Sequence, residues 1–485
     1  MYASLEELIE NPIFKYFYEI SQIPRGSGNE KEISDYLVGF AHERGLEVIQ
    51  DEALNVIIKK PATKGYEQAT AVIIQGHMDM VCEKNDGTIH DFKKDPLKLR
   101  IEDDMLHATD TTLGADNGVA VAYALALLDA KDIPHPALEV VITTEEETTM
   151  NGALSVDPSH FEGKILINID SEEDGKLLVS SAGGLQTILE IPLIEENLPS
   201  EYVSFQLAVK GLIGGHSGME IDQERGNALK LMGRLLYDLS TDFKFVVQHV
   251  RGGMASNAIP REAIITIALP EAEVAKLREK LEEWTNTLRL EFASSDPNVF
   301  VELKQAENSA ATCFSDETKQ KVIKALMLLP NGIQNMSLDI KGLVETSVNV
   351  GKLETTDSSI IIESDARSSV KSRKYAIADQ SKLVAEILDC KFTVTSDYPE
   401  WPYNPDSKVR QLFEKVYKER EGKDPEIIAV HAGIECGIFI EKIPGLDAIS
   451  IGPDMYDVHT PNEHVSIPSM LNNWEYFVAV LREMK

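Results

Sequence analysis

The sequence predicts an α/β protein with two domains, one inserted into the other. Short apolar runs typical of buried strands alternate with amphipathic segments typical of helices, and polar residues directly follow several of the runs. The 485 residues are too many for one ordinary core, so two or more domains are expected. We therefore expect a catalytic domain with a mostly parallel central sheet and helices on both faces, and function beyond the carboxyl ends of its strands.

The first part of this domain is predicted from residues 1–184. Apolar residues at helical spacing predict helices over 5–23 and 30–44, and Pro24 ends the first of these patterns. Residues 83–110 are polar and predict a loop region. Further apolar segments predict strands at 48–49, 55–58, 71–76, 138–144 and 165–169, a short hairpin within 97–106, and a helix over 119–128.

A second α/β pattern occupies residues 185–394. It contains two similar sets of strands and helices, without recognisable sequence identity between them. The first pattern resumes at about residue 395, and its last predicted elements are a helix over 407–420, strands at 427–430 and 448–451, and a closing helix from about 468. The sequence thus predicts a discontinuous domain formed by 1–184 and 395–485, with the inserted domain over 185–394.

The amino-acid composition argues against several classes of partner and site. The net charge of −33 argues against nucleic acid and anionic membrane as partners, because both are polyanions. The N-terminus lacks the basic and apolar regions of a signal peptide, and the sequence has no run of about 18 apolar residues. The four cysteines are scattered, without a CxxC pair. We therefore expect a cytoplasmic protein without a disulfide framework or a thiolate zinc site.

Candidate metal ligands follow several of the predicted strands. His77 and Asp79 are two residues apart, so they point to the same side of an extended chain. The other candidates stand at further strand or loop ends, namely Asp116, Glu146, Glu147, Asp170 and His459. Imidazoles mixed with carboxylates suit zinc, manganese or cobalt, whereas calcium and magnesium rarely take histidine. Two histidines and three carboxylates are too many for one tetrahedral ion and suit two ions that share a carboxylate.

Each candidate also has an ordinary structural interpretation. Asp116-Asn117-Gly118 has the composition of a turn, and Asp170 could cap a helix. The run Glu145-Glu146-Glu147 could be a solvated face. However, this run directly continues a buried strand, where three bare charges would be costly without a cation. The candidates together favour a metal site more strongly than any one of them does alone.

Three motifs carry a resemblance to a known family. They are Gly76-His77-Met78-Asp79-Met80-Val81, Thr112-Leu113-Gly114-Ala115-Asp116-Asn117-Gly118, and Glu146-Glu147 with Met150-Asn151-Gly152-Ala153. With these motifs the chain resembles the dinuclear-zinc metallopeptidase family that includes peptidase D, peptidase T, carboxypeptidase G and the aminoacylases. Matches in the expected order extend the resemblance over almost the whole chain, at residues 168–173, 214–218, 257–261, 431–437 and 459–461.

The resemblance implies a metal role for five residues. His77 and Asp170 would hold one zinc ion, and Glu147 and His459 would hold the other. Asp116 would bridge the two ions. Cobalt or manganese could replace zinc at such ligands.

The resemblance also implies the remaining site residues. Asp79 would orient His77, and Glu146 would be the general base. His216, from the inserted lid domain, would reach the scissile carbonyl as that domain closes. Without the resemblance, we would interpret His216 as an ordinary histidine in a glycine-rich turn. The positions that resemble substrate-binding residues are Asn257, Arg367 and Gly433.

The predicted function is hydrolysis of dipeptides with broad specificity, including Xaa-His types, by a bridging hydroxide on two metal ions. A small peptide is the expected partner, and the resemblance alone implies a homodimer. The alternatives are a deacylase or another exopeptidase of the same superfamily, or a non-catalytic metal- or peptide-binding relative. Thr148-Thr149 and Asp110 depart from the family pattern, and both lie beside predicted site loops.

Overall fold

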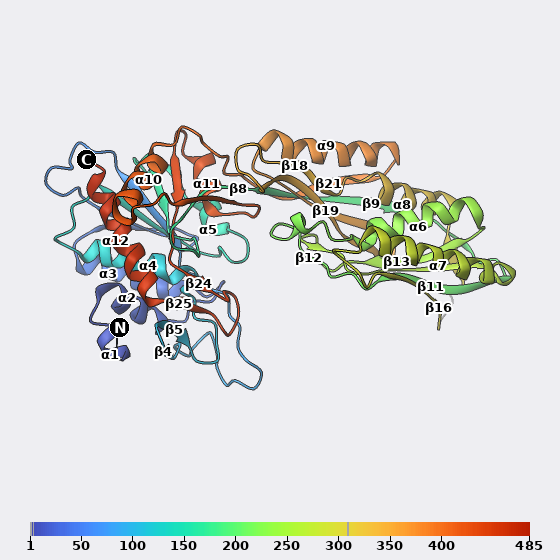
Figure 1. Ribbon diagram of the computed structural model, residues 1–485, viewed down its shortest axis with the longest axis horizontal. Helices are drawn as coiled ribbons and strands as arrows, with labels where there is room; N and C mark the ends of the chain where they lie inside the picture. The colour runs from blue at the N-terminus through green and yellow to red at the C-terminus, as the bar shows by residue number, and fades with distance from the viewer. Residues whose placement is uncertain (1, 3, 308–309) are drawn as a thin grey trace. The chain divides into compact units, whose positions relative to one another are not determined.

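The computed structural model describes residues 2, 4–307 and 310–485. The chain forms two compact units (Figure 1). The first contains Met1–Ser180, Tyr403–Ala429 and Ile434–Lys485, and the second contains Ser181–Pro402 and Val430–Gly433. Both units combine a sheet with helices, so the predicted α/β class is confirmed. A lid role for the second unit stays a prediction.

The first unit is built on an eight-stranded sheet in the order β1-β2-β6-β3-β7-β23-β8-β22. Strands β6, β3, β7 and β23 are mutually parallel, whereas β1, β2 and β8 pair antiparallel with their neighbours. The sheet is therefore parallel at its centre and mixed at its edges. Its strands are β1 Glu47–Gln50, β2 Val56–Lys60, β3 Val72–His77, β6 Leu138–Thr143, β7 Ile165–Asn168, β8 Lys176–Ser181, β22 Glu426–Val430 and β23 Asp447–Ser450.

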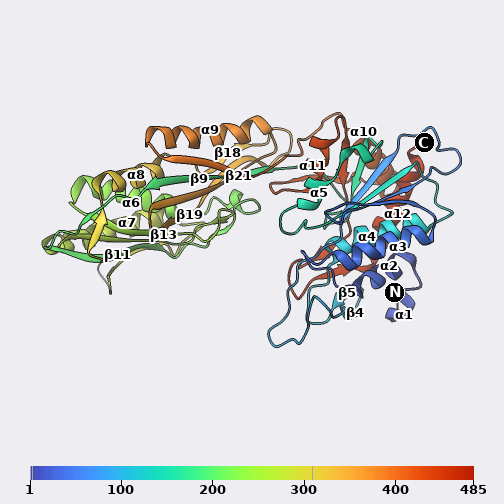
Figure 2. The ribbon, with the colours of Figure 1, turned by 180° about the vertical axis from the view of Figure 1, so that it is seen from behind.

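Helices cover this sheet on both faces, as Figures 1 and 2 show. Every residue of β3 and β6 is buried, which requires cover on both sides of the sheet. Two helices replace the one predicted over 5–23, because Asn11 caps a new helix that begins at Pro12. The helices are α1 Leu5–Leu8, α2 Pro12–Ser21, α3 Lys31–Glu43, α4 Ala115–Asp129, α5 Asn151–Ser155, α10 Lys408–Glu421, α11 Glu435–Lys442 and α12 Ile467–Glu483.

A small second sheet in this unit joins the predicted hairpin to the C-terminal region. Its order is β24-β25-β5-β4. The hairpin consists of β4 Leu99–Glu102 and β5 Met105–Ala108, and β5 pairs with β25 His464–Ser466. Strand β24 Met455–Tyr456 completes the sheet, so the loop between β24 and β25 is held at both ends.

The second unit contains a nine-stranded sheet with two halves of the same topology. In each half the chain runs strand, helix, strand, strand, helix, strand, and the strands lie in the spatial order 4-1-3-2, as in ferredoxin-like folds. One half is β11 Tyr202–Lys210, α6 Ala228–Asp242, β13 Val246–Gly252, β15 Ala263–Pro270, α7 Val274–Glu291 and β16 Phe300–Gln305. The other is β9 Gly183–Pro192, α8 Asp316–Leu328, β19 Val344–Thr355, β20 Ser359–Ser368, α9 Lys371–Ile387 and β21 Lys391–Tyr398.

The two halves are nested and share one sheet. The whole first half lies between β9 and α8 of the second, and the pair β10 Glu195–Asn197 with β17 Thr312–Phe314 forms where the chain leaves and returns. Strands β13 and β19 pair antiparallel and join the halves, and β18 Gly332–Met336 adds to β19. A two-stranded ribbon, β12 Gly215–His216 with β14 Ala258–Ile259, projects from the first half.

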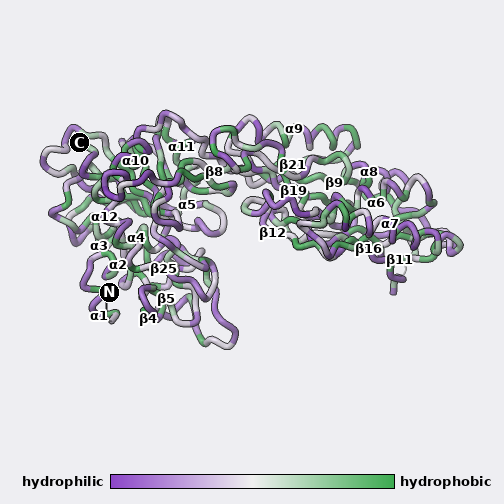
Figure 3. The backbone as a smooth tube through the Cα atoms, in the orientation of Figure 1, coloured by the Kyte–Doolittle hydropathy of each residue, from purple (hydrophilic) through white to green (hydrophobic). Residues whose placement is uncertain are grey.

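One apolar core unites the second unit. It takes buried side chains from seven strands and from all four long helices, including Leu235, Leu281, Leu326 and Val384, so these helices share one face of the sheet. In the first unit, the strands of the central sheet are mainly hydrophobic (Figure 3). Among the described residues, no helix is both long and apolar enough to cross a membrane.

Candidate metal centre

The predicted ligands of the first unit lie at one edge of its central sheet. His77 is the last residue of β3, and Asp170 follows the neighbouring strand β7. The turn after β6 carries Glu146 and Glu147. Because these three strands are parallel and adjacent, their carboxyl ends meet at the same edge. Asp116 comes from the start of α4 and His459 from the loop between β24 and β25.

Five side chains form two groups that share one carboxylate. In the first group, His77 Nε2 lies 3.1 Å from Asp116 Oδ1 and 3.5 Å from Asp170 Oδ1. In the second, His459 Nε2 lies 3.1 Å from Asp116 Oδ2 and 3.0 Å from Glu147 Oε2. The ligand atoms of each group lie within 4.8 Å of one another. Asp116 thus offers one oxygen to each group.

The donor set fits metal ions. Zinc bonds to nitrogen and oxygen are about 2.0–2.2 Å long, so two ligands of a tetrahedral ion lie roughly 3.3–3.6 Å apart. The observed separations of 3.0–3.5 Å are close to that spacing. A carboxylate shared between two such groups is the arrangement of a two-metal centre. The structure therefore brings together the five residues that the sequence named as ligands.

Asp79 links the first group to the turn that carries the glutamates. Its Oδ1 lies 3.3 Å from His77 Nδ1 and accepts a hydrogen bond of 3.1 Å from the backbone N–H of Glu146. Its Oδ2 accepts bonds from the backbone N–H of Glu147 at 3.3 Å and from the Ser27 hydroxyl at 2.8 Å. A proton on Nδ1 leaves Nε2 of His77 as the metal-binding nitrogen. Asp79 therefore has the contacts of an orienting residue.

The electrostatics of the groups favour cations. Burial opposes a charge on His77, but Asp170, Asp116 and Asp79 outweigh it and raise the pKa of this imidazole well above its usual value. Hydrogen bonds to the carboxylates of Asp116 and Glu147 raise the pKa of His459 to about 11. Burial raises the pKa of Asp170 to about 7. The carboxylates thus surround both imidazoles with negative charge that a bound cation would balance.

Glu146 belongs to neither group but lies beside them. Its Oε2 is 4.0 Å from His77 Nε2, and its side chain is 15% exposed. Burial raises the pKa of its carboxyl well above the usual value, although His77 opposes this shift. A carboxyl with a raised pKa next to a metal group is suited to accept and return a proton near neutral pH.

Sequence reasoning missed two residues that hold the turn before Asp116. The buried carboxylate of Glu463 accepts three backbone N–H bonds at 2.7–2.9 Å, from Leu113, Gly114 and Ala115. The buried guanidinium of Arg25 donates to the carbonyls of Met78 and Asp79 at 3.0 and 3.2 Å, and to that of Gly114 at 2.5 Å. Both residues act over long sequence separations, which local patterns do not show.

The second unit gathers the other predicted residues around the ribbon. His216 Nδ1 accepts backbone N–H bonds of 3.1 Å from Gly218 and Met219, so the proton of the neutral ring is on Nε2. Burial, followed by Arg367, lowers the pKa of His216 and favours this neutral form. Asn257 precedes β14, and its carbonyl accepts the N–H of Ser217 at 2.8 Å.

Arg367 is tied to the same loop through a carboxylate. Its Nε donates to Asp365 Oδ2 at 2.9 Å, and Ser217 Oγ donates to the same oxygen at 3.0 Å. Its Nη1 donates to Tyr398 Oη at 3.1 Å. Gly433 lies two residues after His431, whose carbonyl is close to Gly218. The structure therefore places His216, Asn257, Arg367 and the 431–433 segment in one unit.

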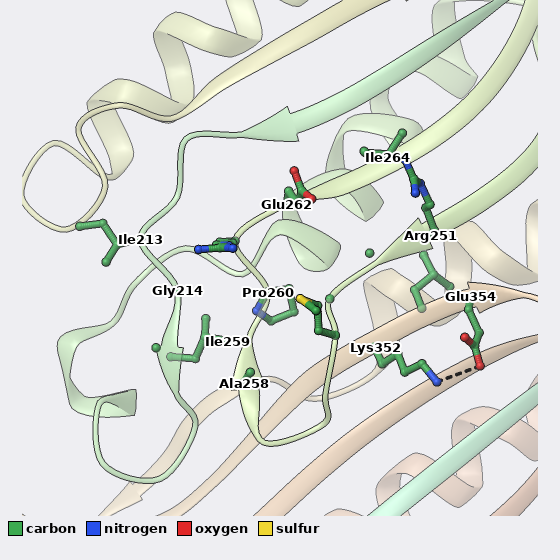
Figure 4. A pocket seen from close by; sticks show the side chains of 16 residues that line it. Ile213, Gly214, Arg251, Ala258, Ile259, Pro260, Glu262, Ile264, Lys352 and Glu354 are labelled. Carbon is green, nitrogen blue, oxygen red and sulfur yellow. Dashed lines mark hydrogen bonds and ion pairs between the residues drawn. The ribbon is translucent and has the colours of Figure 1, made fainter. Parts of the chain in front are cut away.

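A cavity of about 540 Å³ also lies in the second unit (Figure 4). Its walls include Gly214, Pro260, Ile264 and the ion pair of Lys352 with Glu354, which are 2.8 Å apart. Its described lining residues do not include the four predicted substrate-binding and catalytic positions of this unit. The cavity is therefore lined by neighbours of His216 and Asn257 in the motifs 214–218 and 257–261, but not by the four predicted site residues themselves.

The comparisons with known proteins agree with this geometry. The sequence model of peptidase family M20/M25/M40 matches residues 73–483. The chain belongs to this family. The resemblance predicted from its motifs is confirmed, since the chain is 36% identical over 482 residues to cytosol non-specific dipeptidase of Escherichia coli strain K12, covering 99% of each protein.

Solved structures of M20 relatives have the same fold. Aminoacylhistidine dipeptidase from Vibrio alginolyticus is 36% identical with a TM-score of 0.91, covering 98% of this chain and 96% of that one. Aminopeptidase PepT from Bacillus cereus is 17% identical with a TM-score of 0.61, covering 98% of each chain. The second comparison concerns the fold alone.

Proposed function

We propose that this protein is a cytoplasmic metallodipeptidase with two zinc ions per chain. The proposal rests mainly on the position of Asp116. Its two carboxylate oxygens face two separate groups, each completed by one histidine and one further carboxylate. Both relatives with 36% identity are named dipeptidases, and the name of one places it in the cytosol, which supports the substrate class and location. Cobalt or manganese could take the place of zinc.

The ions would supply a water of lowered pKa and would polarise the substrate carbonyl. Glu146 would take the proton of the attacking water and give it to the leaving amine. Asp79 would keep His77 in the tautomer that leaves Nε2 as a ligand. These roles would divide the neighbouring glutamates: Glu147 belongs to the second metal group, and Glu146, beside the groups, would act on the water.

The second unit would supply the groups that hold the peptide. His216 has its proton on Nε2, where it could donate a hydrogen bond to the carbonyl oxygen as negative charge develops. Arg367 suits the free carboxylate of a dipeptide, because a guanidinium binds carboxylates through paired N–H groups. We propose that Asn257 and Gly433 position the peptide backbone, and that this unit closes over the substrate as a lid. A homodimer remains a prediction of the resemblance.

A substrate panel with metal analysis tests the proposal. The purified protein, dialysed against zinc and analysed for metal, is assayed with Ala-His, Gly-Leu, and N-acetyl amino acids of matched side chain. We expect about two zinc ions per chain, hydrolysis of the dipeptides, and little hydrolysis of the acetylated compounds. Preference for the acetylated compounds would instead identify a deacylase, and zinc binding without any hydrolysis would identify a non-catalytic relative.

A further inference from the structure

A buried polar network lies directly beneath the first metal group. It consists of Gln75, Thr143, Asn168 and Glu435, and all four side chains are 0% exposed. Gln75, Thr143 and Asn168 come from the adjacent parallel strands β3, β6 and β7, and Glu435 is the first residue of α11. We call these four residues the strand-end network.

The hydrogen bonds of this network converge on one carboxyl oxygen. Asn168 Nδ2 donates to Gln75 Oε1 at 2.5 Å, and Gln75 Nε2 donates in turn to Glu435 Oε2. The hydroxyl of Thr143 donates to the same Glu435 oxygen at 2.7 Å. Glu435 thus ties together the ends of three neighbouring strands. Its removal would leave Gln75 Nε2 with only the Thr143 hydroxyl at 3.4 Å and the Thr143 hydroxyl with only the carbonyl of Gly76 at 3.2 Å. Both buried donors would thus lose their shorter hydrogen bond, which is costly in a protein interior.

The network is aligned with the ligands of one group. Gln75 stands two residues before His77, and Asn168 stands two residues before Asp170. Side chains two apart on a strand point to the same face, so Gln75 lies one step below His77 on β3. Asn168 is the last residue of β7, and Asp170 follows it two residues beyond the strand end. His77 and Asp170 are the two ligands of the first group besides Asp116. The position of these strand ends therefore sets the separation of those two ligands.

The second group depends on other contacts. His459 comes from the loop between β24 and β25, which the small sheet holds. The backbone N–H of Glu147 donates to Asp79. At the start of the same turn, the backbone N–H of Thr144 donates to Asn55 Oδ1 at 3.1 Å. Thr143 is the only network residue on the strand that leads to Glu147. The strand-end network is therefore connected much more directly to the first group than to the second.

We propose that Glu435 is a positioning residue for one of the two metal ions, the ion held by His77, Asp116 and Asp170. This inference rests on the proposed two-metal centre. Glu435 acts as an acceptor that fixes the strand ends, not through a contact with the metal. Loss of the acceptor lets the ends of β3 and β7 shift, which lowers the affinity of the first group. Residues that orient metal ligands in this way typically contribute about 10–100-fold to metal affinity.

Substitutions at Glu435 separate the acceptor from other effects. Glu435→Leu fills the space but accepts no hydrogen bond. Glu435→Gln keeps a carbonyl oxygen for both Gln75 and Thr143, and burial already raises the pKa of the Glu435 carboxyl to about 8. Glu139→Leu is a matched control, because Glu139 is a buried glutamate of β6 that accepts the backbone N–H groups of Glu162 and Gly163 away from the network.

The experiment isolates each metal group in turn. His459→Ala leaves the first group complete, and Asp170→Ala leaves the second. These two variants serve as backgrounds, and each is prepared with Glu435 unchanged and with Glu435→Leu added. All four proteins are stripped of metal, and their zinc affinity is measured by titration in competition with a chromophoric chelator. We expect Glu435→Leu to weaken zinc binding at least tenfold in the His459→Ala background and less than twofold in the Asp170→Ala background. Glu435→Gln and Glu139→Leu should bind zinc as their backgrounds do.

Other outcomes are equally decisive. Equal weakening in both backgrounds, or no weakening in either, overturns the proposal. Weakening by Glu435→Gln as large as that by Glu435→Leu overturns the acceptor role. If Glu435→Leu does not fold, Gln75→Met cuts the link between Asn168 and Glu435 and must show the same selective loss. Absence of zinc binding by the unsubstituted protein contradicts the proposed function instead.

Discussion

Glu463 provides the sharpest test of how the metal centre is built. This buried carboxylate accepts three backbone N–H bonds from the turn before Asp116, and Oε2 accepts two of them. Glu463→Gln keeps only one oxygen, so at least one of the three bonds is lost. It also removes a negative charge that favours the charged form of the buried Arg25 guanidinium. The turn and this electrostatic interaction should therefore weaken together.

The magnitude follows from the number and kind of bonds lost. A hydrogen bond to a charged group contributes about 1.5–3 kcal/mol, and Glu463→Gln loses at least one such bond and weakens the others by removing the charge. We therefore expect the variant to lower the free energy of unfolding by about 3 kcal/mol. Zinc affinity should fall as well, because the turn sets the position of Asp116.

Urea unfolding of the metal-free protein measures the first effect, and zinc titration measures the second. Glu475→Gln serves as the control, because Glu475 is 68% exposed and its ion pair with Arg420, at 3.4 Å, lies on the surface. We expect the control to change stability by less than about 0.5 kcal/mol. A change of that small size for Glu463→Gln would refute the reasoning.

Three further predictions concern other parts of the protein. Asp79→Asn should lower zinc affinity about 10–100-fold by chelator competition, because it disturbs the tautomer of His77; unchanged affinity would argue against an orienting role. His216→Ala should reduce kcat for Ala-His far more than zinc content, whereas equal losses would indicate a structural role. Burial, and to a smaller extent the charge of Arg367, lowers the pKa of His431 from 6.5 to about 3. Between these two pH values His431 is protonated in the unfolded chain but neutral in the folded protein, so the free energy of unfolding falls as pH falls. From pH 6.5 to pH 5 this contribution is about 2 kcal/mol, and urea unfolding should show it in the unsubstituted protein but not in His431→Gln.

The metal ligands could be named from the sequence because each belongs to a local motif at a strand or loop end. Apolar runs locate the strands, and polar residues after the runs therefore meet at one edge of a parallel sheet. His77 and Asp170 come together for this reason, and Asp116 joins them from the start of α4. Their binding of metal remains a prediction that only metal analysis can test.

The supporting residues could not be found in the same way. Glu463 binds the turn at Leu113 across 350 positions of sequence, and Gln75 meets Glu435 across 360. Such partners come together only through the topology of the sheet and its helices. Each alone resembles an ordinary polar residue, because its function depends on a contact that no local pattern encodes.

The nested topology of the second unit also could not be predicted from the sequence pattern. The repeated strand-and-helix sets indicate two similar halves, and the structure has two such halves in one sheet. The pattern cannot show that one half is inserted into the other, because that depends on which strands pair. Strand β9 precedes the first half in sequence but pairs with β20 and β21, which follow it, and these pairings settle the point.

The most direct test of the central claim is hydrolysis of Ala-His by the zinc-loaded Glu146→Gln variant, with zinc content measured on the same sample. The account predicts that zinc stays at the level of the unsubstituted protein while turnover falls about 10²–10⁴-fold, because the amide cannot carry the proton. Undiminished hydrolysis with zinc bound would contradict the assignment of Glu146 as the general base.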